Sequence, residues 1–179
     1  CHAAHHGKIP PKVGWEFAGY EDLGEPIGTC EICGQDIRHS FLISHPNWSP
    51  LEVGETCCDN LTCTEIASNH MESIRRFNDR RKRFVESPRW NRFRSGHEFL
   101  CQDQIFIEVR QLPEGFQIRM NGTKGKQLFN DVIAAKARAF DVLESVDHAE
   151  FIAKVRRRPA PPRQGPLPTP PRSARCGSV

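Results

Sequence analysis

Apolar and polar residues alternate along QDIRHSFLISH, residues 35–45, so that Ile37, Phe41 and Ile43 fall on one face. A period of two residues predicts a β-strand with one buried face. The run ends in HPNWSP, which has the composition of a turn. The next residues, LEVGE, are typical of a short returning strand. We therefore expect a β-hairpin in this part of the chain.

The period changes after Asp59. Between residues 61 and 86, bulky residues recur at steps of three and four, which predicts one amphipathic helix. The residues that share its face are Ile66, His70, Ile74, Phe77, Arg81 and Phe84. Ser87 and Pro88 end the pattern, because the residue before a proline disfavours helical backbone. We assign residues 61–94 to this helix and a linker.

Residues 95–155 predict a second module. HEFLCQ, QIFIEVRQL and GFQIRMNG have the composition of three short strands, with LPEG and NGTKG as turns. Cys101 alternates with apolar neighbours, so we expect it to be buried in the first of these strands. NDVIAAKARAFDVLESV then predicts a helix, with Asn130 or Asp131 as its N-cap. We therefore expect a three-stranded antiparallel sheet followed by a helix.

The two ends of the chain differ from the rest in composition. Residues 1–12, CHAAHHGKIPPK, predict a flexible N-terminus, although their cysteine and histidines are metal-ligand types. Residues 156–179 are rich in proline and arginine, which predicts a disordered tail with polyproline character. Such a tail is a possible ligand for a protein partner of the SH3 type.

Cysteine spacing indicates a metal centre. Cys30 and Cys33 form a C-x2-C pair followed by Gly34, and this spacing is typical of a zinc knuckle. Cys57 comes at the end of the predicted hairpin, where a helix is expected to begin and to favour a thiolate. Knuckle, hairpin and helix together predict a treble-clef or zinc-ribbon-like module over residues 13–60. The expected fold class is therefore α+β, with structural Zn²⁺ as the cofactor.

The fourth zinc ligand has several candidates. A treble clef takes it from the helix three residues after Cys57, but that residue is Asn60, a poor zinc ligand. If the turn pairs His45 with Leu51, Cys57 lies across from His39, and His45 lies about 20 Å away at 3.3 Å per residue. We therefore rank the candidates His39, His45 and then Cys58.

Disulfide bonds are the second interpretation of the clustered cysteines. No apolar run approaches the roughly 18 residues of a membrane helix, and no secretory signal is evident, so we expect a reducing cytoplasm. In that compartment clustered cysteines bind metal more often than they form disulfides. No thiol lies in a nucleophile motif, and we expect Cys63 to pack within the helix.

Charge divides along the chain. Residues 1–60 contain three basic and nine acidic residues, whereas residues 75–94 contain nine basic and two acidic ones. Arginine forks match phosphate groups, and Trp90 among them can stack on a base. A solvated helix face accounts for such a run equally well. The residues expected to contact nucleic acid are Arg75, Arg76, Arg80, Arg81, Lys82, Arg83, Arg89, Trp90, Arg92 and Arg94.

The run WEFAGYEDLG, then CEICG, IR, HP and VGETC, resembles a family of small zinc-binding proteins encoded by bacterial and phage mobile elements. The similarity covers about residues 14–60 and its motifs are specific. It implies a zinc site and a mobile-element context, but no reaction. This sequence has Phe41 where the family often has a histidine.

Two weaker resemblances concern function. The three strands and AKARAFDVLE look like Apetala-type DNA-binding domains, which lay a sheet in the major groove. Cys30, His39, Asn60 and His70 loosely resemble an HNH nuclease, but the second cysteine pair of those enzymes is missing. We expect a non-enzymatic, zinc-stabilised protein that binds nucleic acid, DNA rather than RNA. The alternatives are a zinc-stapled protein-interaction module and a metal-dependent nuclease.

Overall fold

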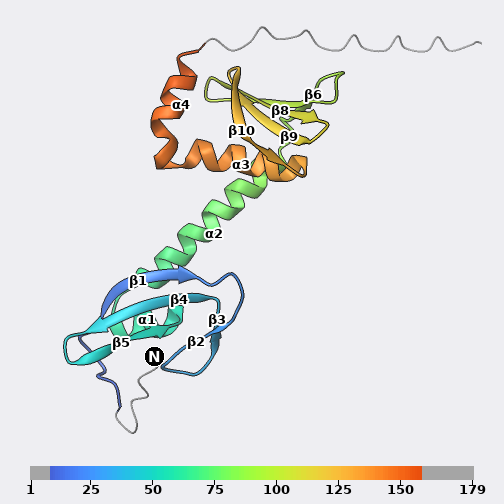
Figure 1. Cartoon of the computed structure of the whole chain (residues 1–179). Coiled ribbons are helices and arrows are strands. Elements are labelled where there is room, and N and C mark those ends of the chain that lie inside the picture. The colour runs from blue at the N-terminus through green and yellow to red at the C-terminus, as the bar shows by residue number, and fades with distance from the viewer. Residues whose placement is uncertain (1–8, 159–179) are drawn as a thin grey trace, which may run out of the picture. The chain divides into compact units, whose positions relative to one another are not determined.

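The computed structural model describes residues 9–158, which form a mixed α+β fold with antiparallel sheets (Figure 1). The chain divides into two compact units, residues 1–78 (unit 1) and residues 79–179 (unit 2). The described residues contain helices α1 (Glu55–Thr62), α2 (Ile66–Val85), α3 (Val132–Glu144) and α4 (Ala149–Arg156), with a 3-10 turn, η1 (Val146–His148). The division falls within α2. None of these helices has the length and apolar character needed to cross a bilayer.

Unit 1 is built on a three-stranded sheet with the order β1-β4-β5. Its strands are β1 (Glu16–Asp22), β4 (His39–His45) and β5 (Trp48–Val53), and all neighbours are antiparallel. Two short strands, β2 (Gly28–Thr29) and β3 (Asp36–Ile37), pair separately. The hairpin expected from the alternating pattern is confirmed as β4 and β5, with Phe41 and Ile43 fully buried.

The register of this hairpin differs from the predicted one. Ile43 pairs with Leu51 and His45 pairs with Trp48, whereas the sequence pattern places His45 opposite Leu51. The turn is therefore shorter than HPNWSP suggests, and a register shift follows Ile43. Because β5 ends at Val53, opposite Phe41, Cys57 does not lie across the hairpin from His39.

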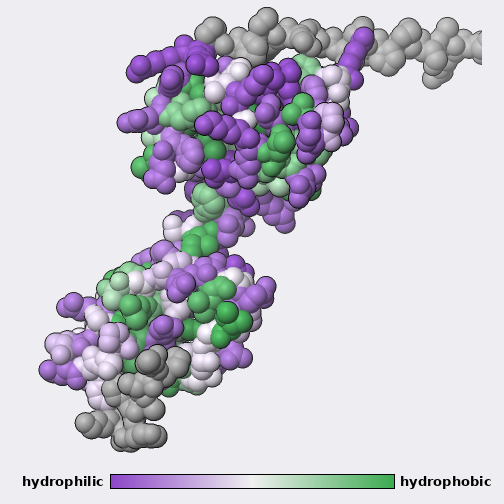
Figure 2. All heavy atoms as spheres, in the orientation of Figure 1, coloured by the Kyte–Doolittle hydropathy of each residue, from purple (hydrophilic) through white to green (hydrophobic). Residues whose placement is uncertain are grey.

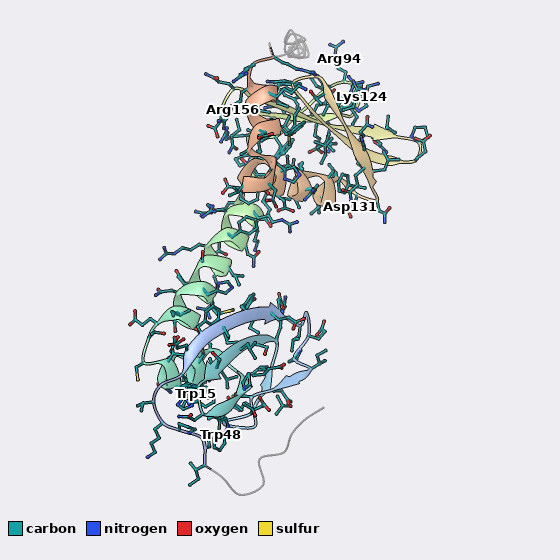
Figure 3. The ribbon with its side chains drawn as sticks, turned by 60° about the vertical axis from the view of Figure 1, so that its left-hand side comes forward. Trp15, Trp48, Arg94, Lys124, Asp131 and Arg156 are labelled. Carbon is teal, nitrogen blue, oxygen red and sulfur yellow. The ribbon has the colours of Figure 1, made fainter. Side chains whose placement is uncertain are left out.

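The core of unit 1 lies between this sheet and the helices. It contains Trp15, Cys30, Phe41, Ile43, Leu51, Val53, Cys58, Ala67 and Met71. Trp48 packs against the same cluster, and Figure 3 labels it together with Trp15. Two cysteines in so small an apolar cluster leave the unit with limited hydrophobic stabilisation.

The predicted single helix over residues 61–86 is interrupted. Helix α1 ends at Cys63, which adopts a left-handed backbone with φ 51° and is exposed rather than packed in a helix. Asp59 then accepts hydrogen bonds from the backbone amides of Ala67 (2.8 Å) and Ser68 (3.0 Å) at the start of α2. The carboxylate satisfies amides that have no partner within a helix, so two helices replace the one expected.

Unit 2 contains a five-stranded antiparallel sheet with the order β10-β9-β8-β7-β6. Three strands were predicted, and they correspond to β7 (Glu98–Gln102), β8 (Ile105–Leu112) and β9 (Gly115–Met120). The pattern missed β6 (Asn91–Arg92) and β10 (Thr123–Phe129), most of whose residues are exposed. Cys101 is exposed on β7, which corrects the expectation that it is buried.

Helix α3 packs against β8, β9 and β10, and its N-cap is Asp131, one of the two predicted candidates. The Asp131 carboxylate accepts a hydrogen bond from the amide of Ala134 at 2.7 Å, and Figure 3 labels this residue at the start of the helix. Ala135, Ala139 and Phe140 bury the inner face of α3. The sequence pattern did not predict α4, which extends to Arg156, the residue at which the tail was expected to begin. The rest of the expected tail, residues 159–179, lies outside the described residues.

One buried amide ties the parts of unit 2 together. Asn121 has a left-handed backbone, φ 43°, and follows β9. Its Oδ1 accepts from the amide of Phe106 at 2.7 Å, and its Nδ2 donates to the carbonyls of Gln104 (3.1 Å) and Val155 (2.9 Å). The Asn121 side chain therefore joins the β7–β8 turn to α4.

Candidate metal centre and basic surface

Three predicted metal ligands converge in unit 1. The Sγ atoms of Cys30, Cys33 and Cys57 all lie within 4.8 Å of one another. Tetrahedral ligands that bind Zn²⁺ through bonds of about 2.3 Å lie about 3.8 Å apart, so small side-chain shifts bring these sulfurs into range. Within residues 9–158, no other group of three histidine, cysteine or carboxylate residues gathers in this way.

The turn between β2 and β3 positions the first two thiols. The amide of Cys30 donates to the carbonyl of Gln35, and the amide of Gly34 donates to the carbonyl of Cys30, both at 2.8 Å. Gly34 has φ 74°, a left-handed conformation that glycine adopts without strain. These bonds close the loop tightly, which places Cys33 beside Cys30 as the spacing predicted.

A contact with β5 connects this turn to the third thiol. The amide of Glu31 donates to the carbonyl of Glu52 at 3.0 Å, and the amide of Glu52 donates to the carboxylate of Glu31 at 2.6 Å. Two residues after Glu52, Gly54 caps α1, and Cys57 lies in the first turn of that helix. The sheet and the helix start therefore hold all three sulfurs together.

Two of the three thiols have pKa values that differ from that of an ordinary thiol. Burial raises the pKa of Cys30, but backbone amides of Cys33, Gly54 and Ile32 donate to its sulfur, so its pKa lies below that of an ordinary thiol. Burial and the neighbouring thiols raise the pKa of Cys57 to about 12. A bound cation would offset the repulsion between adjacent thiolates.

The donor set limits which ion fits. Three thiolates suit a soft or borderline cation, whereas Ca²⁺ and Mg²⁺ take oxygen ligands. The residues present therefore fit a thiophilic metal ion. They supply three ligands, and a tetrahedral ion needs one more.

The first candidate for the fourth ligand, His39, does not join the three thiols. Its Nδ1 lies 2.9 Å from the hydroxyl of Tyr20 and 3.8 Å from the carboxylate of Asp22. The carboxylate of Asp22 is held by two bonds from Arg38, at 2.8 and 3.0 Å, which hold the pKa of Asp22 well below its usual range. The difference in register accounts for this separation, because His39 begins β4 and Cys57 lies beyond the end of β5.

The other two candidates also lie apart from the thiol group. His45 packs against the ring of Trp15 with centroids 5.2 Å apart, and its Nδ1 accepts a bond from the amide of Asn47. Cys58 is fully buried in the core of unit 1, and burial raises its pKa to about 11. Neither is grouped with Cys30, Cys33 and Cys57 among the residues that the structure describes.

The residues of the suspected nuclease motif only partly meet. The rings of both His39 and His70 contact Tyr20, with centroids 6.0 and 4.1 Å away. His70 Nε2 is buried and has no hydrogen-bond partner in the described part of the chain. Asn60 is exposed on α1, and no third metal-ligating residue within residues 9–158 joins the two histidines.

Many of the arginines expected to contact nucleic acid are already paired. Arg81 makes two bonds to Asp141, at 2.7 and 2.9 Å, and Arg80 pairs with Glu144 at 3.0 Å. The remaining pairs are Arg75 with Glu55, Arg76 with Glu72, and Arg92 with Glu98. A phosphate would have to compete with these carboxylates, so these arginines are weaker candidates than their number suggested.

Trp90 packs within unit 2. Its Nε1 donates to the carbonyl of Phe84 at 2.9 Å, its ring meets Phe84 edge-on at 5.5 Å, and Lys136 Nζ lies 4.7 Å from its centroid. Lys136 in turn pairs with Glu98. A half-buried ring with these contacts has a structural role, and the expected stacking on a base loses its geometric support.

Other cations remain available. Lys82 and Arg94 are exposed and make no ion pair with any residue between 9 and 158. Arg83 and Arg89 are exposed and bond only to backbone carbonyls, those of Asp79 and Cys101. Figure 3 shows Arg94 extending from the loop between β6 and β7, and hydrophilic residues cover much of the visible face of unit 2 in Figure 2.

The charge division matches the structural division. Unit 1 contains 5 basic and 11 acidic residues, whereas unit 2 contains 20 basic and 11 acidic residues. The net charges are −6 and +9. The thiol group therefore lies in an acidic unit, and the surplus of positive charge lies in the other.

The comparisons with known proteins found no similarity: no family model, no curated protein and no solved structure matches this chain. The geometry and charge of its own residues are therefore the basis for assigning a function.

Proposed function

We propose that this chain is a non-enzymatic, zinc-stabilised protein that binds nucleic acid through unit 2. The observation that carries the proposal is the charge division, with +9 in unit 2 and −6 in unit 1. A phosphate backbone is attracted to the positive unit 2 and repelled by the negative unit 1. Metal binding and nucleic-acid binding are thus assigned to different units.

In this proposal unit 1 is a treble-clef-like module held by one Zn²⁺ on Cys30, Cys33 and Cys57. The support is the convergence of their sulfurs from a tight turn and a helix start. A bound zinc ion would cross-link the two segments. Its binding free energy would then stabilise the folded module, because the site forms only on folding. Cys30, Cys33 and Cys57 would hold the ion, and we assign it a structural role because it would join the turn after β2 to the start of α1.

The proposed contact surface in unit 2 contains fewer of the basic residues than the sequence suggested. Lys82, Arg83, Arg89 and Arg94 carry charges that no carboxylate within residues 9–158 neutralises. Lys124 and Lys126 on β10 are also exposed and add two positive charges to this unit. These residues favour a contact with phosphates, which holds nucleic acid without reading its sequence.

The test is binding across salt. Labelled single-stranded DNA, duplex DNA and RNA are titrated with the full chain between low and physiological ionic strength. If four to six phosphates are engaged, log affinity for duplex DNA falls with log salt at a slope of about −4 to −5. Absence of binding to all three at low salt would contradict the proposal and favour a zinc-stapled interaction module instead. The possible partner for the proline-rich tail concerns residues outside those described.

A further inference from the structure

Unit 2 contains a shallow hollow where its helices meet β7. The hollow has a volume of about 270 Å³ and is lined by Arg80, Arg83, Phe84, Ser87, Arg89, Leu100, Gln102, Phe140 and Glu144. These residues come from the last turns of α2, the segment after it, β7 and α3. Every one of them belongs to unit 2, so the hollow does not depend on how the two units are arranged.

The rim of this hollow carries uncompensated positive charge. Arg80 is paired with Glu144 at 3.0 Å. Arg83 donates from Nε to the carbonyl of Asp79 at 3.3 Å, and Arg89 donates from Nη2 to the carbonyl of Cys101 at 2.9 Å. A carbonyl orients a guanidinium but does not neutralise it, so two full cations remain at the rim with several N–H donors unused.

The floor of the hollow is apolar. Phe84, Leu100 and Phe140 are 7%, 2% and 4% exposed, so none of them offers an open aromatic face for stacking. Such a floor reduces the screening by water and strengthens the field of the two arginines. A volume of about 270 Å³ lies below the usual range of about 300–1,000 Å³ for drug-sized ligands. The space suits a phosphate group with part of its sugar, and its floor offers no exposed ring on which a base could stack.

We infer that this hollow is a phosphate-binding site, which holds one phosphate of a bound nucleic acid between Arg83 and Arg89. This inference rests on the proposed function and names the chemical group that the basic unit recognises. Arg80 donates a hydrogen bond to Glu144, so its charge is already paired. The Gln102 side chain supplies a neutral polar group on β7. The phosphate is either a terminal monoester or an internal diester.

The test compares two double variants of equal charge. Arg83→Ala with Arg89→Ala removes the two cations of the hollow, and Lys82→Ala with Arg94→Ala removes two exposed cations outside it. The first pair is expected to weaken binding of a labelled oligonucleotide at least tenfold more than the second, in fluorescence anisotropy at low salt. Equal losses would show that only net charge matters and would overturn the site while leaving nucleic-acid binding intact.

A second comparison tests the site without removing an arginine. Gln102→Glu places a carboxylate at the hollow, and Gln111→Glu places one on an exposed position of β8. The first is expected to weaken binding several-fold more than the second. Oligonucleotides with and without a 5′-phosphate identify the source, because a preference that disappears in the Arg83 and Arg89 variant assigns the terminal phosphate. Equal affinity for both oligonucleotides assigns an internal one.

Inorganic phosphate provides a test that does not involve nucleic acid. Titrated into the full chain, it is expected to shift the side-chain Nε–H resonances of Arg83 and Arg89 and to leave that of Arg94 in place. Such shifts in a chain that binds no nucleic acid would reject the proposed function but keep the site. Uniform shifts of all arginines, or none, together with equal losses in the double variants, would reject the site.

Discussion

The two units of this chain obtain their stability by different means. The core cluster of unit 1 includes two cysteines, Cys30 and Cys58. Cys30 also belongs to the group of three converging thiols, and it is the one buried member of that group. Unit 2 has a five-stranded sheet in which five consecutive residues of β8, Ile105 to Val109, are buried, and a helix covers it. Within this unit the buried Lys136 pairs with Glu98. Hydrophobic burial is therefore the main source of stability in unit 2. In unit 1 we expect metal binding to provide a large part of the stability.

A loss of metal and a loss of apolar contacts should consequently affect separate parts of the molecule. Segment-resolved hydrogen exchange of the full chain distinguishes them, because it reports local opening along the sequence. Protection of unit 1 should follow the metal, and protection of unit 2 should follow the packing of its sheet.

Metal removal should perturb the chain most. A strong chelator, or Cys30→Ser, Cys33→Ser or Cys57→Ser, should release the metal and open residues 15–62 to exchange, since structural zinc supplies about 10–16 kcal/mol in zinc-finger peptides. The measurement is metal content by mass spectrometry together with exchange. Cys63→Ser and Cys101→Ser serve as controls, because both thiols are exposed and lie outside the cluster. Full protection of unit 1 in metal-free protein would contradict this division of stability.

A cavity in the sheet should instead destabilise unit 2 and leave unit 1 protected. Ile107 is fully buried, so Ile107→Ala should lower the free energy of unfolding of unit 2 by about 2–5 kcal/mol. Exchange should increase over residues 98–155 while the metal stays bound. Ile133→Ala is the matched control, because Ile133 is 64% exposed and its truncation should change stability little. Equal effects of the two variants would show that β8 is not at the centre of the core.

Acid should weaken unit 2 through Glu98. Burial raises the pKa of Glu98, but the bonds from Lys136 and Arg92 outweigh burial and lower it. The charged pair therefore contributes its full stabilisation above the unfolded pKa, about 4.3, and loses it as the pH falls through the lower folded value. Thermal melts between pH 6 and pH 3 should show this loss.

A substitution isolates that contribution. Glu98→Gln should destabilise unit 2 at neutral pH by about 1–3 kcal/mol and flatten the dependence on pH, because it leaves Lys136 without its partner. Glu114→Gln removes an exposed carboxylate from the β8–β9 turn and should leave the pH profile as it is. The same profile in both variants would assign the acid sensitivity to another group.

His39→Ala should change the molecule least. Its side chain bonds to Tyr20 and is separate from the three thiols, so the variant should keep its metal and lose about 0.5–1.5 kcal/mol from unit 1. Metal content and chelator titration provide the measurement, with Cys33→Ser for comparison. Loss of metal from His39→Ala would restore His39 as a ligand and would require the start of β4 to move.

Local sequence patterns predicted the parts of the fold that depend on local chemistry. The alternation around Phe41 and Ile43 predicted β4, the acidic cap predicted the start of α3, and C-x2-C-G predicted the close approach of Cys30 and Cys33. Each depends on neighbours within a few residues, because turn geometry, capping and strand pleat are set locally.

The features that were missed depend on contacts between distant residues. The hairpin register, and with it the place of His39, is set by a bulge and by the packing of the sheet. Strand β10 lacks an apolar face and forms by pairing with β9. The ion pairs of Arg80 and Arg81 join residues sixty or more positions apart, so the charge run looks available until helix α3 is in place.

The buried amide of Asn121 has a consequence for the chemical ageing of the protein. Asn121 precedes Gly122, and an asparagine before a glycine is prone to deamidation, because the next backbone nitrogen can attack the side-chain carbonyl. In the native state Nδ2 donates to the carbonyls of Gln104 and Val155, and the backbone is fixed in a left-handed turn. Attack requires that turn to open. The rate at which position 121 converts to aspartate and isoaspartate in stored protein therefore records how often this end of the sheet separates from α4.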